Sequence, residues 1–439
     1  MSKIYSFTTP IEADIVDAFC TLQKGFTDQF VYYRKDKPVR YMGLGRCVAL
    51  SSVDDIDCVY AGDKEEPPVY FSFNRFDATN PAAPDELFES FPQLHFLLPE
   101  IVLIENARGS FLQVNSLGPV YPGRVERFYR QALAASPRTR RTIRYTREPD
   151  SREAWEQAMA QALDAIEHDR VKKVVLSRRQ KVVAASPFSS KDLLVNLIDG
   201  SAQGTVLMYR YADVFFCACT PELLVRKTGQ RIESMCLAGS APVGETAKER
   251  EAYGAQLLAD EKNLEEHDYV VAFIRDVLMR NCYDVQVPSE PTLLKLPTIQ
   301  HLYTPCSAEL LEGTSLWDIA AQLHPTPAVA GTPVGEARML LRQIEPYNRG
   351  FYAGACGYVD GKGDGEFSVA LRSGVFDGEI GWIYAGCGIV AQSNVASEYD
   401  EVALKLQTIL SAFDGEAKAV CADDSKECSC EAERGAHES

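Results

Sequence analysis

The sequence predicts a large α+β fold. Of the 439 residues, 46% are hydrophobic and 24% are charged, which is typical of a globular chain and excludes extended disorder and fibrous repeats. Strand-like and helix-like segments also mix without a regular βαβ rhythm, which disfavours a doubly wound parallel sheet. The length is sufficient for two or three domain-sized units or for one large two-lobed fold.

Four regions follow from the pattern along the chain. Residues 1–135 contain strand-like runs separated by turn signals and are predicted to form an N-terminal α/β lobe. Residues 136–150 hold five arginines and few apolar side chains, which indicates a basic, solvated connection. The region 151–414 carries the remaining elements and the chemically informative residues. From 415 to 439 the chain is small, polar and acidic, which is the composition of a disordered tail.

Apolar periodicity predicts the elements of the region 151–414. A helix is expected over Asp150–Asp169, because Trp155, Met159 and Ile166 lie on one stripe, and Asp150 and Glu153 have capping-box spacing. Further helices are predicted at about 246–280 and 398–413. Strands are predicted at Val171–Val183, Val206–Phe216, Leu223–Lys227, Phe367–Ser373 and Gly381–Ala391.

The charge balance limits the classes of partner. The chain has 45 basic and 62 acidic residues, a formal net charge of -17, which argues against nucleic acid or an anionic membrane as the main partner. A small anion is not excluded, because it needs only a few local cations. No secretory signal and no apolar stretch long enough to span a membrane are recognised, so a reducing cytoplasm with free thiols is expected for the 13 cysteines. Cys428 and Cys430 are either a metal-binding pair or, as we expect, bind nothing.

Two charged residues lie inside apolar segments, where an unpaired charge is costly. Lys173 begins an apolar run and shares one strand face with Val175 and Ser177. A lysine partly removed from water can act as a general base; the alternative is a strand-edge lysine facing water, and Lys172 leaves the assignment uncertain by one residue. Glu222 follows Pro221 at the start of another apolar run and is either a general acid or an exposed turn carboxylate.

Three further glutamates are candidates for a metal site. Glu266 lies on a predicted helix, on a stripe with apolar residues, so it needs a partner if the stripe is buried. Glu398 and Glu401 are three residues apart and share a helix face with Lys405. Clustered carboxylates suit Mg²⁺, whereas the lack of a Cys or His ligand pattern argues against zinc. The alternative for Glu266 is a helix stripe that is only half buried. The alternative for Glu398, Glu401 and Lys405 is a ladder of ion pairs on the protein surface.

Arg372 is a candidate for binding a carboxylate. It ends a predicted hairpin, where it shares a face with the small residues Ser368 and Ala370 and so leaves room for a bidentate contact. Nearby, Gly386 and Gly388 lie in a strand-like run and would let a ligand approach the backbone closely.

Taken in order, these segments resemble the chorismate-utilising enzymes, and within that family the isochorismate synthases. The resemblance covers residues 150–411 and implies a large two-lobed chorismate-binding enzyme fold with mostly antiparallel sheets flanked by helices. The motifs that carry it are KVVLSR (173–178), TPELL (220–224), LAGS (237–240), EH (266–267), QHL (300–302), HPTPAVAG (324–331), RGFYAG (349–354), VALRS (369–373), YAGCGIV (384–390) and E-x-x-E-x-x-x-K (398–405).

The resemblance implies a Mg²⁺-dependent isomerisation in which water adds at C2 of chorismate and the C4 hydroxyl departs. Lys173 is expected to activate the water and Glu222 to protonate the hydroxyl. Gly239 is expected to bind near that hydroxyl, and His301 either lines the same pocket or is a core histidine with both nitrogens bonded. Mg²⁺ is expected on Glu266 and Glu401, with Glu398 holding a coordinated water. The substrate carboxylates are expected on Arg372, Tyr384, Gly386, Gly388 and Lys405.

Two positions separate the branches of this family. Relatives that aminate chorismate generally lack the lysine base and use a glutaminase partner, so Lys173 favours water and no glutaminase subunit is expected. Salicylate-forming relatives usually carry Thr where this chain has Ala328, which favours release of isochorismate. A salicylate synthase and a catalytically silent chorismate-binding protein remain the alternatives. A monomer is expected, serving menaquinone or siderophore biosynthesis.

Overall fold

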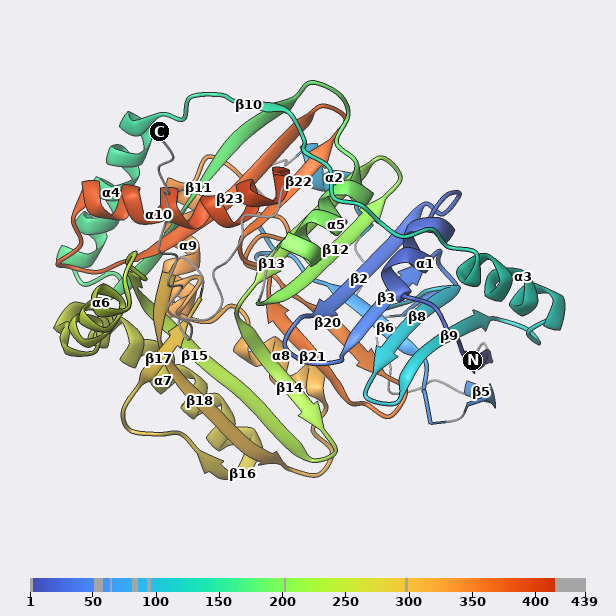
Figure 1. Ribbon diagram of the computed structural model, residues 1–439. Coiled ribbons are helices and arrows are strands. Elements are labelled where there is room, and N and C mark those ends of the chain that lie inside the picture. The colour runs from blue at the N-terminus through green and yellow to red at the C-terminus, as the bar shows by residue number, and fades with distance from the viewer. Residues whose placement is uncertain are drawn as a thin grey trace, which may run out of the picture.

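Two large β-sheets form the framework of the computed structural model, which describes residues 3–50, 58–63, 65–80, 86–92, 96–200, 203–296 and 299–414 (Figure 1). Within these residues the larger sheet has 13 strands, in the order β10-β11-β23-β22-β13-β12-β2-β3-β8-β9-β1-β5 with β19 beside β11. Its strands are β1 (Ile4–Pro10), β2 (Asp28–Arg34), β3 (Arg40–Leu44), β5 (Cys58–Gly62), β8 (Ile101–Asn106), β9 (Gly109–Ser116), β10 (Tyr145–Arg147), β11 (Lys173–Ala184), β12 (Thr205–Tyr211), β13 (Val214–Thr220), β19 (Gly331–Thr332), β22 (Ser373–Asp377) and β23 (Ile380–Ile389).

The smaller sheet has ten strands within the same described ranges, in the order β16-β18-β15-β14-β21-β20-β6-β7-β4 with β17 beside β18. They are β4 (Val48–Leu50), β6 (Val69–Phe73), β7 (Phe96–Leu98), β14 (Leu223–Thr228), β15 (Arg231–Pro242), β16 (Cys282–Gln286), β17 (Thr292–Lys295), β18 (Ile299–Leu310), β20 (Ala355–Asp360) and β21 (Gly365–Val369). The helices are α1 (Ile15–Leu22), α2 (Glu86–Glu89), α3 (Pro122–Leu133), α4 (Arg152–Glu167), α5 (Ser190–Gly200), α6 (Ala247–Ala259), α7 (Glu261–Asn281), α8 (Leu316–Leu323), α9 (Val334–Ile344) and α10 (Val395–Leu410), followed by the 3₁₀ turn η1 (Ser411–Phe413).

The hydrophobic core lies between the two sheets. Phe30 on β2 stacks on Phe71 of β6, with ring centroids 5.5 Å apart, and Tyr32 on β2 meets Tyr358 of β20 edge to face at 5.0 Å. Among the described strands the pairing is antiparallel except between β1 and β5. Helices flank the sheets, with α10 lying along β23 (Figure 1). The predicted α+β fold with mostly antiparallel sheets is confirmed.

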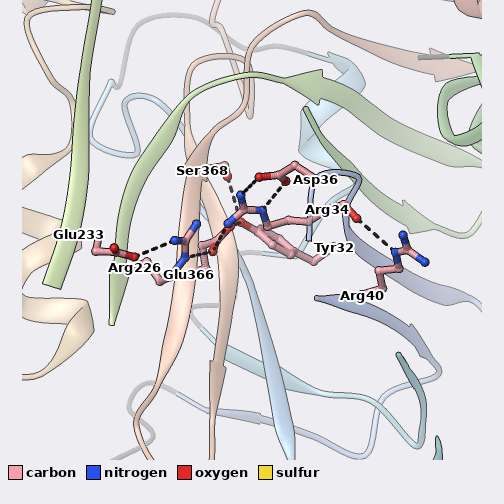
Figure 2. A network of polar contacts seen from close by, with 8 residues as sticks. All are labelled: Tyr32, Arg34, Asp36, Arg40, Arg226, Glu233, Glu366 and Ser368. Carbon is pink, nitrogen blue, oxygen red and sulfur yellow. Dashed lines mark hydrogen bonds and ion pairs between the residues drawn. The ribbon is translucent and has the colours of Figure 1, made fainter. Parts of the chain in front are cut away.

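A buried polar network also joins the sheets (Figure 2). Glu366 on β21 accepts hydrogen bonds from Tyr32 (2.5 Å) and Arg34 (3.0 Å), both on β2, and forms an ion pair with Arg226 on β14. Burial raises the pKa of Glu366 to about 7 against the opposing charge of Arg34. Because a buried carboxylate requires partners, this network ties a strand of the first 50 residues to strands more than 190 positions later.

The first 135 residues share both sheets with the rest of the chain. β2 pairs with β12, and β6 pairs with β20. The connection 136–150 is also attached: Arg138 binds Asp14 at the N-terminus of α1 (2.8 Å) and Asp199 on α5 (3.0 Å). The boundary at residue 135 stays a prediction, and it does not correspond to a break in the sheets. The predicted tail 415–439, with Cys428 and Cys430, lies outside the described residues.

Besides the strand predicted at Phe367–Ser373, which is described with the site, three predicted elements are wrong in detail. The single helix predicted at 246–280 is two helices, because Asp260 takes an extended conformation and caps α7 by accepting from the Asn263 amide (2.8 Å). The strand predicted at Val206–Phe216 is a β12–β13 hairpin that turns at Ala212, whose φ is +53°. The predicted capping box of α4 is wrong because Ser151, one residue later, is the N-cap. No helix in the described part of the chain is long and apolar enough to cross a membrane.

Candidate active site

Lys173 is buried inside the larger sheet. Its strand, β11, pairs with β23 on one side and with β19 at Thr332 on the other, so Lys173 is not on an open edge and its side chain is 0% exposed. Its ammonium lies 3.0 Å from Oε1 of Glu266. The neighbouring Lys172 is exposed and pairs with Asp169. Lys173, and not Lys172, is therefore the buried lysine, and the alternative of a water-facing Lys173 is wrong.

Glu222 lies in the short connection where the chain leaves the larger sheet for the smaller one, between β13 and β14. Its backbone is fixed on both sides, because its amide donates to Oγ1 of Thr220 (3.2 Å) and its carbonyl accepts from the amide of Val369 (3.1 Å). The residue is 5% exposed. Burial raises the pKa of Glu222 to about 7, against the opposing charges of Lys173, Arg372 and Lys405. A carboxyl group with such a pKa can hold and release a proton near neutral pH.

Three glutamates, carried by two helices, are each paired with a lysine. Glu266 on α7 pairs with Lys173, as described above. On α10, Glu398 pairs with Lys262 and Glu401 pairs with Lys405, each at 2.5 Å. Glu266 and Glu398 are buried, so the half-buried stripe is wrong for Glu266 and the surface ladder is wrong for Glu398. Glu401 does form the ladder's pair with Lys405, one helical turn away.

Electrostatics link the three carboxylates. Burial alone would raise the pKa of Glu266, but the charge and hydrogen bond of Lys173 lower it overall. Burial, followed by the like charge of Glu401, raises the pKa of Glu398. The bare backbone of Gly388 leaves the space for this arrangement, because a Cβ there would lie 2.1 Å from Oε1 of Glu266 and 2.9 Å from Cε of Lys173. A carboxylate-only donor set is what a hard divalent cation prefers, although within the described ranges no three acidic, His or Cys side chains gather as a ready-made metal site.

Arg372 is a buried cation without a partner in the described part of the chain. The sequence prediction of a strand through Arg372 is wrong: β21 ends at Val369, and the positive φ of Arg372 (+53°) turns the chain from the smaller sheet into β22 of the larger one. The residue is 6% exposed, and its guanidinium forms no hydrogen bond or ion pair with any residue that the structure describes. Burial lowers the pKa of Arg372. Since an unpaired buried charge is costly, this guanidinium indicates an anionic ligand.

One cavity brings most of the predicted site residues together. Those that line it are Glu222, Gly239, Glu266, His301, Ala328, Arg372, Gly386, Gly388, Glu401 and Lys405. Lys173 does not line it directly but contacts Glu266, which does. Glu398 and Tyr384 also lie outside the lining. The ring of Tyr384 stacks behind that of Tyr352, with centroids 5.3 Å apart, and it is Tyr352 that faces the cavity.

His301 presents one ring nitrogen without a partner. Nδ1 lies 2.9 Å from Oγ of Ser240 and 3.3 Å from the carbonyl of Gly239. Nε2 is buried and has no partner among the described residues, so the alternative of a fully bonded core histidine is wrong. Burial, with the charges of Arg372 and Lys405, lowers the pKa of His301 well below its ordinary value. The ring is therefore neutral, and Nε2 is available to a ligand.

Sequence reasoning missed several residues of this site. Arg349 donates to the carbonyls of Val329 (2.8 Å) and Val175 (2.6 Å), and so fixes two walls of the cavity from behind. Arg349 and Tyr352 both lie in the RGFYAG motif, so the signal was present without an assigned role. Lys262 precedes Glu266 by four residues, one helical turn, and this spacing could have indicated it.

A cavity lined by residues of both sheets and of α7 and α10, with a buried acid, a buried lysine behind it and an arginine that has no partner among the described residues, indicates an enzyme that binds a small anion. A profile of the family described as "Chorismate binding enzyme" matches residues 1–414, and the chain belongs to this family. The match confirms the resemblance drawn from residues 150–411 and extends it over the N-terminal strands.

Named relatives are similar over most of the chain. Isochorismate synthase MenF of Bacillus subtilis is 34% identical over 80% of this chain and 76% of its own length. Isochorismate synthase EntC of Escherichia coli K12 is 35% identical over 59% of this chain and 66% of its own length. Among solved structures, the menaquinone-specific isochorismate synthase MenF of Escherichia coli has a TM-score of 0.77 at 23% identity and covers 94% of both chains. Anthranilate synthase component I of Streptococcus pneumoniae has a TM-score of 0.68 at 19% identity, covering 88% of this chain and 92% of its own.

Proposed function

We propose that this chain is an isochorismate synthase: it adds water at C2 of chorismate and expels the C4 hydroxyl. The observation that carries the proposal is the meeting, around one cavity, of a fully buried lysine, Lys173, with a carboxyl group, Glu222, whose pKa burial raises to about 7. An acid and a base in one enclosed site suit a reaction in which one oxygen loses a proton while another gains one. The 34% identity to an isochorismate synthase supports the choice of reaction.

The proton transfers balance without an external reagent. Lys173 acts as the base and accepts a proton from the attacking water as the oxygen of that water bonds to C2 of the ring. The ring double bonds shift, the bond between C4 and its oxygen breaks, and Glu222 donates a proton so that this oxygen leaves as water. Return of a proton from Lys173 to Glu222 restores the site. One water enters and one leaves, so the reaction is an isomerisation.

The two substrate carboxylates would be bound by the cations of the cavity. Arg372 has the fork geometry for a bidentate contact and has no competing partner among the described residues. Lys405 already donates to the carbonyl of Gly386 (3.1 Å), at the wall where Gly386 and Gly388 leave the backbone accessible. We assign the tyrosine contact to Tyr352 rather than Tyr384, because only Tyr352 lines the cavity. Nε2 of His301 would bind a ring substituent.

The carboxylate set fits Mg²⁺. Glu266, Glu398 and Glu401 supply only oxygen donors, and the missing side chain of Gly388 lets the carboxylate of Glu266 lie against that strand, beside Lys173. When bound there, Mg²⁺ would neutralise and orient the ring carboxylate of the substrate. Glu266 and Glu401 would be direct ligands, and Glu398 would hold a coordinated water.

Ala328 supports release of isochorismate without loss of pyruvate. It lines the cavity and offers only a methyl group where salicylate-forming relatives usually carry a hydroxyl. Lys173 supports water rather than ammonia as the nucleophile, so we propose a monomer that needs no glutaminase subunit. We propose menaquinone or siderophore biosynthesis as the use of isochorismate; a menaquinone-specific isochorismate synthase is among the solved structures that share the fold.

A product assay tests this function. Purified protein is incubated with chorismate and Mg²⁺, and isochorismate, salicylate and pyruvate are resolved. We expect isochorismate without pyruvate, with activity abolished by EDTA. Salicylate with equal pyruvate would retain the site but overturn the branch assigned from Ala328. Binding of chorismate without any product would overturn the enzymatic function.

A further inference from the structure

Lys262 forms an ion pair across the two helices that carry the three glutamates. It lies in the first turn of α7, and its Nζ is 2.5 Å from Oε1 of Glu398 near the start of α10. The side chain of Glu398 is 2% exposed, whereas that of Lys262 is 27% exposed. The pair therefore joins a buried carboxylate to a lysine that retains access to solvent.

Lys262 is the one lysine of three for which the proposed reaction has no use. Lys173 and Lys405 each pair with one of the other glutamates and also have proposed roles with water and substrate. Lys262 contacts neither, and it does not line the cavity. The three glutamates nonetheless act on it electrostatically. Burial acts to lower the pKa of Lys262, but the charges of Glu398, Glu266 and Glu401 outweigh burial and raise it.

We propose that Lys262 is an internal competitor for the divalent cation: its ammonium occupies Glu398 until the metal binds and must then withdraw. The inference rests on the proposed metal site. An ammonium ion and Mg²⁺ repel each other over a few ångströms, and both would lie close to Glu398, the ammonium in direct contact and Mg²⁺ through a coordinated water. Lys173 and Lys405 are 0% and 10% exposed, so they have little room to move, whereas Lys262 has a flexible stem and a route to water.

Two consequences follow for the protein before metal binds. The affinity of the site for Mg²⁺ is lower than it would be if Lys262 did not neutralise Glu398. In addition, α7 and α10 are held together at their N-terminal turns by the Lys262–Glu398 pair. Metal affinity is therefore set in part by a residue that makes no contact with metal or substrate.

Calorimetric titration with Mg²⁺ alone, without chorismate, tests the proposal. We expect Lys262→Met to bind Mg²⁺ at least about tenfold more tightly than the parent, because one nearby positive charge has been removed. Lys262→Arg, which keeps the charge, should bind Mg²⁺ within about threefold of the parent. Lys248→Met, at an exposed position on α6, is the matched control and should leave the dissociation constant unchanged.

Thermal unfolding gives a readout that does not depend on activity. Without Mg²⁺, Lys262→Met should have a lower Tm, because Glu398 loses its partner, and added Mg²⁺ should raise that Tm more than it raises the parent's. Unchanged or weaker Mg²⁺ binding by Lys262→Met, with the parent binding normally, would overturn the competitor role alone. Absence of Mg²⁺ binding in both proteins would overturn the proposed metal site and this inference with it.

Discussion

Replacing Glu222 by glutamine is expected to remove most of the activity while stabilising the protein at alkaline pH. Glutamine has nearly the same shape but cannot supply a proton to the departing hydroxyl. Loss of a general acid typically costs about 10²–10⁴ in rate, which corresponds to roughly 3–5 kcal/mol of activation free energy. Because Arg372 and Lys405 are untouched, chorismate should still bind to the variant.

The stability change can be worked from the burial of Glu222. Its pKa is about 7 in the folded protein against an ordinary value of 4.5, a difference of about 2.5 units or roughly 3 kcal/mol. Since the folded pKa is the higher one, this stability is fully present below about pH 4.5 and is lost as pH rises through about 7. About 2 kcal/mol of the loss falls between pH 5.5 and pH 8. The glutamine variant has no titrating group at this position. Its free energy of unfolding should therefore rise by about 2 kcal/mol relative to that of the parent between pH 5.5 and pH 8.

Both halves of this prediction are measurable on the same preparations. Initial rates of isochorismate formation report the catalytic loss, and urea unfolding at pH 5.5 and pH 8 reports the free energies of unfolding. Glu312→Gln, at an exposed position after β18, is the control and should change neither quantity. A turnover number close to that of the parent would refute the general-acid role. Parallel pH dependence of stability in variant and parent would refute the assigned pKa.

The remaining predictions address the base, the carboxylate contact and the metal. Lys173→Ala should lose roughly 10²–10⁴ in turnover while Lys172→Ala stays near normal; equal losses would contradict the assignment, and initial rates decide. Arg372→Lys should raise the KM for chorismate about tenfold to a hundredfold, because the bidentate geometry is lost; an unchanged KM would contradict the docking role. Glu401→Gln should raise the half-saturating Mg²⁺ concentration about tenfold or more in an activity titration, and no shift would remove Glu401 from the metal site.

Much of the site was predictable because its charged residues stand out within apolar, strand-like segments of the sequence. The β-branched run after Lys173 predicted β11. The apolar run that Glu222 begins left a buried acid and an exposed turn carboxylate open, and the structure buries the residue. The ambiguity between Lys172 and Lys173 could not be resolved locally. Alternation along a strand places the two side chains on opposite faces, but which face is buried depends on β19 and β23, more than 150 residues away.

Features that depend on tertiary structure were not predictable from the sequence. The break at Asp260 interrupts a continuous helical pattern, and it separates α6 from the helix that carries Lys262 and Glu266. The turn at Arg372 interrupts a strand-like pattern so that the chain can change sheets. The pair between Lys262 and Glu398 spans 136 positions in sequence, so spacing alone could not join the two residues.

The acidic composition and the anion-binding site are compatible because the site has its own charge balance. The molecule has a formal net charge of -17, yet four cations surround the cavity and its carboxylates: Lys173, Lys262, Arg372 and Lys405. Three glutamates oppose them as ion-pair partners of the three lysines, and Glu222, with a pKa of about 7, is only partly ionised at neutral pH. The local charge is therefore close to zero or slightly positive, with Arg372 as the cation in excess. The net charge of the chain argued against a polyanionic partner. It could not reveal the local charge of the site, because four cations are a small fraction of 107 charged residues.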